Sequence, residues 1–317
     1  MKPDAIAVKA GGLRLTNPTV LASGVLGASL SWVLDALKHG AGAAVTKSVG
    51  PSHREGYPGP TLVEVDSGMV NAVGLPNPGA KKFSQELAFL RGKSLPLIVS
   101  IFGGDEEEFR GVAHALDGND FMAYELNLSC PHVAGVGTEV GHRPEVVSRV
   151  VRAVKSMTHR PVFAKLSPNT ERLLEVAEAA VDAGADGLTA INTVRALSID
   201  VESGKPALSN RYGGLSGGAI RPIALRCVYE LREKFDVPIM GCGGVSTWEH
   251  AVQFFLAGAN AVQVGTAALQ TLARFNEINF GVLEYMERKG LKRLDELVGA
   301  AHRGRGFPTR PKGSAGS

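Results

Sequence analysis

The chain is poor in cysteine and has no long apolar run. Its 317 residues include only Cys130, Cys227 and Cys242, which do not have the spacing of metal ligands, so neither a disulfide framework nor a structural zinc site is expected. No segment approaches the ~20 apolar residues that a membrane-spanning helix needs, and residues 1–10 carry no apolar run of signal-peptide length. We therefore expect a cytoplasmic protein with no metal site and no membrane association.

Excess charge of one sign is also small. The 34 Lys and Arg residues nearly balance the 31 Asp and Glu residues, and no basic helix is interleaved with aromatic residues, which argues against nucleic acid as a ligand. Much of the excess lies near the C-terminus, in Arg303, Arg305, Arg310 and Lys312. We expect residues 1–300 to form one domain and residues 301–317 to form a basic, flexible tail.

Two signatures of electron-carrying groups are missing as well. No expected strand is followed by a Gly-x-Gly-x-x-Gly turn that opens a helix, so no site for NAD is evident. An iron–sulfur cluster generally needs four cysteine ligands, and the three cysteines here are widely spaced. Neither group is expected on this chain.

What the chain does contain is a repeated alternation of short, β-branched apolar segments with longer amphipathic ones. Residues 145–157, 170–183, 222–235 and 247–257 have apolar residues at helical spacing. This alternation is typical of parallel β-α-β units and predicts an α/β fold, a single-domain (β/α)8 or TIM barrel with its active site at the C-terminal ends of the strands. The eight expected strands are residues 20–24, 44–49, 97–103, 123–130, 162–167, 187–193, 238–244 and 261–266.

Two long insertions rich in glycine and proline follow the second and sixth expected strands, at residues 50–77 and 194–220. Because loops after barrel strands build the active site, we expect both insertions to cover it.

Polar residues gather at the strand ends. Any one of them could be structural, since serine, asparagine and glycine often end strands, but a barrel brings all the strand ends to one mouth. Their convergence favours a functional site. These residues are Ser23, Lys47, Ser48, Ser100, Asn127, Cys130, Lys165, Asn192, Thr193, Gly243, Gly244, Gly265 and Thr266.

The last two strand ends suggest a phosphate site. Backbone N–H groups of glycine turns after the seventh and eighth strands of barrels commonly receive a phosphate, and here the turns are residues 241–244 and 265–266. The alternative is a pair of turns with no ligand. Lys165 would point a cation into the mouth, and because burying an unpaired lysine is costly, we expect an anionic or electron-accepting partner for it.

The segment from Tyr124 to His132 is the most informative, because a strand ending in Asn127 and then Cys130 presents an amide and a thiol to the same mouth. Cys130 is therefore a candidate base or nucleophile. A free cysteine is more often a small buried apolar residue, and this interpretation is favoured for Cys227 and Cys242.

From about residue 13 to residue 269, these motifs resemble the class 1 dihydroorotate dehydrogenases. Asn127-Leu-Ser-Cys-Pro131 is similar to the catalytic strand of that family, and Asn71-Ala-Val-Gly-Leu75 is similar to its loop that holds the substrate carboxylate. Further matches are residues 22–24, Lys47-Ser48, Lys165, Ile191-Asn-Thr193, Gly214-Leu-Ser-Gly217, Gly243-Gly244 and Gly265-Thr266.

The resemblance implies oxidation of (S)-dihydroorotate to orotate in de novo pyrimidine biosynthesis, with bound FMN as hydride acceptor and Cys130 as base. Catalytic roles fall to Cys130 and Lys47. The implied substrate contacts are Lys47, Asn71, Ala72, Val73, Gly74, Leu75, Asn127, Asn192 and Thr193. The implied FMN contacts are Ser23, Lys47, Ser48, Ser100, Asn127, Lys165, Ile191, Gly217, Gly243, Gly244, Gly265 and Thr266.

Three residues depart from the commoner family pattern: His132 where many members have Asn, and Tyr57 and Thr61 where they have Asn and Arg. His132 is shared with dihydropyrimidine dehydrogenases, so a related flavoenzyme acting on uracil or thymine is one alternative. A non-catalytic barrel that binds a phosphorylated metabolite is another, but it leaves Cys130, Lys47 and Lys165 unexplained.

The residues His132 and Ile191-Asn-Thr193 look most like the class 1B members, which work with an electron-transfer subunit. The resemblance thus implies a partner that carries FAD and an iron–sulfur cluster, in a homodimer or hetero-oligomer.

Overall fold

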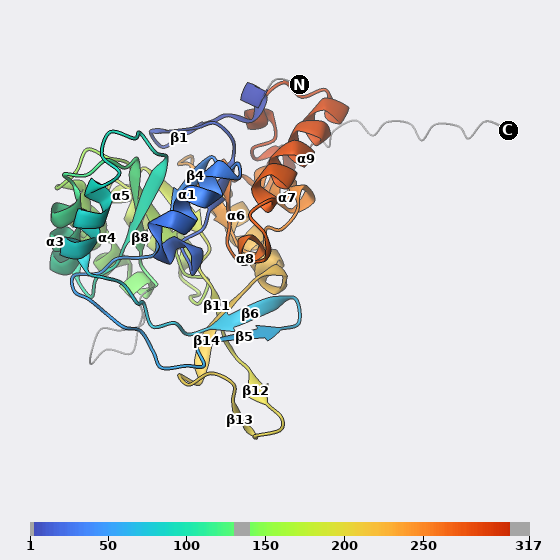
Figure 1. The fold of residues 1–317 in the computed structure, drawn as a ribbon. Helices are drawn as coiled ribbons and strands as arrows, with labels where there is room; N and C mark the ends of the chain where they lie inside the picture. The colour runs from blue at the N-terminus through green and yellow to red at the C-terminus, as the bar shows by residue number, and fades with distance from the viewer. Residues whose placement is uncertain (1–2, 130–139, 305–317) are drawn as a thin grey trace.

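The structure, a computed structural model, describes residues 3–129 and 140–304. Parallel strands form a closed barrel in the spatial order β10-β15-β16-β3-β4-β7-β8-β9, seen from the side in Figure 1. Each overlaps one strand expected from the sequence, and the (β/α)8 barrel is confirmed. The barrel strands are β3 (Thr19–Leu21), β4 (Ala43–Val45), β7 (Leu97–Ile101), β8 (Ala123–Asn127), β9 (Val162–Leu166), β10 (Gly187–Ala190), β15 (Ile239–Cys242) and β16 (Ala261–Val264).

Helices surround the barrel and cover its outer face. On α4, Val146, Val150 and Val154 recur at helical spacing and are fully or almost fully buried, as the core-facing stripe of such a helix should be. The four helices expected from the sequence correspond to α4, α5, α6 and α7. The helices are α1 (Leu30–Lys38), α2 (Ala80–Ala88), α3 (Glu106–Leu116), α4 (Pro144–Lys155), α5 (Leu173–Asp182), α6 (Arg221–Lys234), α7 (Trp248–Ala257), α8 (Thr266–Gln270) and α9 (Arg274–Lys289).

Short 3-10 turns join these elements: η1 (Pro3–Ile6), η2 (Leu26–Ala28), η3 (Val140–His142), η4 (Gly218–Ile220), η5 (Leu294–Glu296) and η6 (Ala300–Arg303). Over the described ranges, no helix has the length and apolar character needed to cross a membrane. Cys130, His132, Arg305, Arg310 and Lys312 lie outside the described residues.

A small hairpin closes the N-terminal end of the barrel. It consists of β1 (Val8–Ala10) and β2 (Leu13–Leu15), which pair antiparallel through a turn at Gly11. Gly11 has a left-handed φ of +57°, and a Cβ at this position would lie 2.7 Å from the carbonyl oxygen of Asp186, just before β10. Glycine is needed for this close approach. The opposite end of the barrel, where the strands have their C-terminal ends, opens onto a cavity.

The two long insertions pair with each other over that open end. Strands β5 (Leu62–Val65) and β6 (Gly68–Asn71) come from the first insertion, and β11 (Val194–Leu197) and β14 (Tyr212–Ser216) come from the second. They form one antiparallel sheet in the order β11-β14-β6-β5, on the side of the barrel opposite β1 (Figure 1). A further two-residue pair, β12 (Ile199–Asp200) and β13 (Lys205–Pro206), extends the second insertion.

Candidate active site

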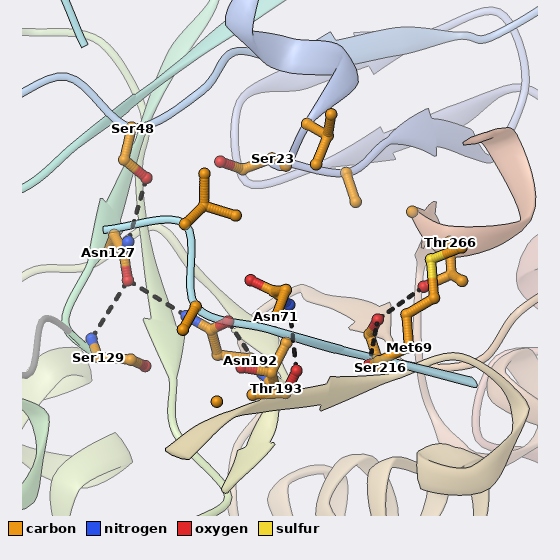
Figure 2. A pocket seen from close by; sticks show the side chains of 18 of the residues that line it. Ser23, Ser48, Met69, Asn71, Asn127, Ser129, Asn192, Thr193, Ser216 and Thr266 are labelled. Atoms are coloured by element: carbon orange, nitrogen blue, oxygen red, sulfur yellow. Dashed lines mark hydrogen bonds between the residues drawn. The ribbon is translucent and has the colours of Figure 1, made fainter. Parts of the chain in front are cut away.

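A cavity of about 610 Å³ lies between the C-terminal ends of the barrel strands and the four-stranded sheet. Side chains from both parts of the fold point into it (Figure 2). Of the predicted site residues, Ser100 does not line this cavity, and Cys130 lies outside the described residues. Those that line it are Ser23, Lys47, Ser48, Asn71, Ala72, Val73, Gly74, Leu75, Asn127, Lys165, Ile191, Asn192, Thr193, Gly217, Gly243, Gly244, Gly265 and Thr266.

A chain of hydrogen bonds fixes the amide side chains along one wall. The Asn127 amide nitrogen donates to Ser48 Oγ over 3.1 Å, and Asn192 donates to Asn127 Oδ1 over 3.2 Å (Figure 2). Behind them, the buried Ser100 hydroxyl lies 2.8 Å from that of Ser48, and the backbone N–H of Thr193 donates to Asn192 Oδ1. Ser100 therefore supports the wall from behind, and the two amides are held ready for a planar polar ligand.

Lys47 supplies a cation that the rest of the described chain does not neutralise. It follows β4, lines the cavity and is half-buried. Burial, and to a smaller extent the charge of nearby Lys165, lower the pKa of Lys47 below its ordinary value. Among residues 3–129 and 140–304 its ammonium group has no hydrogen-bond or ion-pair partner, so an anionic ligand in the cavity would relieve an unfavourable charge.

Lys165 is different, because the anionic partner that the sequence leads us to expect is a residue of the chain itself. Its ammonium group lies 3.1 Å from Glu125 Oε1 and 3.1 Å from Gln263 Oε1, inside the barrel. The second carboxylate oxygen of Glu125 accepts from Thr189 and Gln263. Burial lowers the pKa of Lys165, but the charge and hydrogen bond of Glu125 help to outweigh it, so the pKa is raised. The lysine is not unpaired, and its charge does not by itself require an anionic ligand.

Glu125, Thr189 and Gln263 were not identified from the sequence. The signal that could have found them is the two-residue period of a strand, which puts Glu125 on the same face of β8 as Asn127. Barrel interiors are usually filled by branched apolar residues. A fully buried carboxylate in that layer therefore indicates a charged partner on a neighbouring strand, which is Lys165 on β9.

The loop from Asn71 to Leu75 forms the wall contributed by the first insertion. Gly74 and Leu75 have left-handed φ angles of +78° and +54°, and a Cβ on Gly74 would lie 2.6 Å from the backbone nitrogen of Tyr57. Over the described residues, the N–H groups of Gly74 and Leu75 have no hydrogen-bond acceptor. Asn71 donates to the carbonyl oxygen of Gly214 over 3.1 Å (Figure 2). Adjacent free N–H groups of this kind favour an anion.

The glycine turns after β15 and β16 form the opposite wall. Gly243 and Gly244 have positive φ angles of +135° and +75°, and a Cβ on Gly244 would lie 2.6 Å from the carbonyl oxygen of Gly217. The N–H groups of Gly243, Gly244 and Gly265 have no acceptor among the described residues. Thr266 donates to Ser216 over 2.9 Å and so connects this wall to β14 (Figure 2). The turns can receive a phosphate group through backbone donors.

The two described cysteines have different surroundings. Cys227 is fully buried on α6, as the sequence predicted. Cys242 is half-buried and lines the cavity, so it is not simply a packing residue. Burial raises the pKa of the Cys242 thiol, although nearby Lys165 opposes the shift, and the thiol is therefore not activated as a nucleophile.

Barrels of this architecture carry their chemistry at the end where this cavity lies, so fold and site together define an enzyme-type (β/α)8 barrel with a site for a small anionic ligand. Comparison with known proteins narrows this class. The family model for dihydroorotate dehydrogenase matches residues 5–286, and the chain belongs to this family.

Two relatives illustrate the likeness. The chain is 49% identical over 300 residues to a protein of Pyrococcus furiosus, covering 94% of this chain and 99% of the relative. It is 46% identical over 298 residues to a protein of Methanocella arvoryzae, covering 94% and 98%. Both relatives are named dihydroorotate dehydrogenase B (NAD(+)), catalytic subunit. The resemblance to class 1B members seen in the sequence is confirmed.

Proposed function

We propose that this chain oxidises (S)-dihydroorotate to orotate with bound FMN, as a step of de novo pyrimidine biosynthesis. One observation carries the proposal: the N–H groups of Gly74 and Leu75 and the ammonium group of Lys47, which have no partner among the described residues, line one cavity with the glycine turns. Such a cavity offers sites for two anionic groups on opposite walls, and the substrate carboxylate and the FMN phosphate are groups of that kind.

The substrate is held on the insertion side in this proposal. Gly74 and Leu75 donate their free N–H groups to the carboxylate, and Asn71 contributes its amide, with Ala72 and Val73 completing the loop. Asn127, Asn192 and Thr193 bond the ring through polar groups whose orientations are already fixed. Lys47 neutralises negative charge between the substrate and the cofactor. A uracil-type substrate has no carboxylate for the loop, so the dihydropyrimidine alternative lacks a specific supporting observation.

The residues on the other side fit FMN. The backbone donors for its phosphate are those of Gly243, Gly244, Gly265 and Thr266. Gly244 packs so closely against Gly217 that there is no room for a Cβ, which keeps the turn after β15 narrow. Lys165 lies beside the cavity floor, and its charge is compensated by an ion pair with Glu125. Ser23, Ser48 and Ile191 complete the set, and Ser100 acts through Ser48. When bound, FMN supplies the hydride acceptor.

Cys130 is the proposed base, on the evidence of the sequence alone. In the sequence it follows Asn127, the last residue of β8, by three positions. A thiol of ordinary pKa about 8.5 serves as a base near neutral pH when a neighbouring cation or hydrogen bond eases its ionisation. In this role Cys130 removes a proton from the carbon next to the one that gives up the hydride.

The names of the relatives support a partner for reoxidation. A catalytic subunit named for NAD(+) passes electrons onward, and this sequence has neither a dinucleotide fingerprint nor four cysteines for a cluster. We propose a partner subunit that carries FAD and an iron–sulfur cluster, in a homodimer or hetero-oligomer. We also propose that residues 1–300 form the catalytic domain and residues 301–317 form a basic tail.

Dye reduction by the purified, FMN-loaded chain tests the substrate assignment. We expect dihydroorotate to drive reduction of an artificial dye, and dihydrouracil, which lacks the carboxylate, to be a poor substrate. Preference for dihydrouracil would assign the chain to dihydropyrimidine oxidation instead. Inactivity with both, in protein that binds FMN, would favour a binding barrel.

A further inference from the structure

Asn77 lies directly behind the loop that faces the cavity, although it does not line the cavity itself. It is buried, with 6% of its surface exposed, and its backbone pairs in both directions with that of Arg54 over 2.9 and 3.0 Å. Its side chain then reaches three further backbone groups.

The side chain of Asn77 connects three segments of the fold. Its Oδ1 accepts from the N–H of Gly50, which follows β4, over 3.1 Å, and from the N–H of Gly79, which precedes α2, over 2.9 Å. Its Nδ2 donates to the carbonyl oxygen of Leu75 over 3.0 Å. The Oδ1 atom of Asn77 thus bonds the barrel and the start of α2, while its Nδ2 atom bonds the 71–75 loop.

Leu75 is the residue that most needs such a restraint. A left-handed φ of +54° is uncommon for a residue other than glycine. The N–H of Leu75, like that of Gly74, has no acceptor among the described residues and faces the proposed carboxylate. The bond from Asn77 holds the carbonyl oxygen of the same residue. Fixing that carbonyl fixes the following peptide plane and restricts the rotation of Leu75 about its backbone.

We propose that Asn77 is a positioning residue for carboxylate recognition: its amide holds Leu75 in the left-handed conformation that keeps the N–H groups of Gly74 and Leu75 turned to the ligand. The proposal rests on the function proposed above. It assigns to Asn77 no contact with the substrate. Its effect is to organise the loop before the substrate arrives, which lowers the ordering cost of binding.

Two substitutions separate the donor bond from the acceptor bonds. Asn77→Asp keeps an oxygen for Gly50 and Gly79 but cannot donate to Leu75. Asn77→Ser keeps a short acceptor for Gly79, as serine does in such turns. It loses the bond to Leu75 without adding charge, and it also loses the acceptor for Gly50, which Asn77→Asp retains. Asn119→Asp is the matched control, because Asn119 is also buried and donates to the carbonyl oxygen of Leu116 and to Ser84, away from the cavity.

The experiment measures orotate binding to the FMN-loaded proteins by calorimetry, and hydrogen exchange of residues 71–77 in the same proteins without orotate. We expect both Asn77 variants to bind orotate about tenfold more weakly than the wild type, the loss that one hydrogen bond corresponds to. Exchange in residues 71–77 should be faster, FMN binding and kcat at saturating dihydroorotate should be retained, and Asn119→Asp should match the wild type.

Every other outcome contradicts either the proposed function or the positioning role of Asn77. If the wild type loaded with FMN does not bind orotate, the proposed function fails and the role of Asn77 fails with it. If the wild type binds orotate and both Asn77 variants bind equally well, or exchange in residues 71–77 is unchanged, only the positioning role is wrong. A loss confined to Asn77→Asp would indicate charge repulsion, and an equal loss in Asn119→Asp would indicate general destabilisation. Both results contradict the proposal.

Discussion

Replacing Glu125 with Gln removes the negative charge that compensates Lys165 inside the barrel. The two side chains are 1% and 5% exposed, and their charged atoms lie 3.1 Å apart. Removing one partner of a buried ion pair costs about 3–5 kcal/mol, because the remaining charge is left uncompensated. The Gln side chain keeps a carbonyl oxygen for Lys165, so we expect a loss of about 3 kcal/mol in the free energy of unfolding near neutral pH.

The dependence of this loss on pH follows from the pKa of Lys165. In the wild type the folded-state pKa is raised, so the stabilisation is fully present below the unfolded value of about 10.4 and changes little between pH 7 and 9. In Glu125→Gln the main interaction that opposes the effect of burial is lost, and we expect the pKa of Lys165 to fall below the unfolded value. The unfolded variant then binds more protons than the folded one, and its stability rises with pH.

In the variant, Lys165 can lose its proton, and this limits the loss in the free energy of unfolding. Deprotonating a lysine of unfolded pKa about 10.4 requires about 4.6 kcal/mol at pH 7 and about 2 kcal/mol at pH 9, so the ionic part of the loss cannot exceed these values. Chemical unfolding at both pH values, with FMN at saturation, measures the difference. Glu178→Gln is the control, because the side chains of Glu178 and its partner Lys234 are 48% and 39% exposed. Removing this pair should lower the free energy of unfolding by about 1 kcal/mol or less. A Glu125→Gln loss as small as this control, or one that does not shrink at pH 9, would refute the reasoning.

Three further predictions concern the chemistry. Cys130→Ala should retain FMN yet lose flavin reduction by dihydroorotate, because only the proton acceptor is removed; reduction at the wild-type rate, followed by stopped-flow absorbance, would exclude Cys130 as the base. Asn71→Ala should raise KM for dihydroorotate by about tenfold or more while affecting dihydrouracil much less, and an equal effect on both in steady-state assays would contradict the carboxylate role. The chain alone should reduce dyes but not NAD⁺ with dihydroorotate, since no NAD site is evident; rapid NADH formation by the pure chain would refute this.

The barrel could be predicted from the sequence because its strands are short and almost entirely buried. Segments such as Leu97–Ile101 and Val162–Leu166 are covered on both faces, and strands of that kind appear as apolar runs between helical patterns. The convergence of polar residues followed from the same pattern, because all parallel strands end at one mouth. These features are local in sequence, which is why they are visible without a structure.

The sheet over the mouth could not be predicted in this way. Its central pairing joins β6 to β14, where Asn71 bonds Gly214 across 143 residues of chain. Two consecutive glycines in β14 give no indication of a strand, yet a Cβ on Gly213 would lie 2.6 Å from the carbonyl oxygen of Asn71. Glycine is required here by close approach of another strand, a relation that the local sequence does not contain.

The partner of Lys165 could not be identified from the sequence for a similar reason. The sequence shows that a lysine ends a barrel strand, but its partner Glu125 lies 40 residues away on the neighbouring strand. Only the register of β8 against β9 brings the two side chains together. Lys47, by contrast, is half-buried and its ammonium group has no partner among the described residues.

The central claim is that this chain takes electrons from dihydroorotate into a bound flavin. Anaerobic addition of dihydroorotate to the purified, FMN-loaded protein tests it most directly, with the visible absorbance of oxidised flavin and the formation of orotate followed together. We predict that the absorbance bleaches and that orotate appears in equal amount to the flavin reduced. A protein that binds no FMN, or one whose flavin stays oxidised in excess dihydroorotate, would contradict the account.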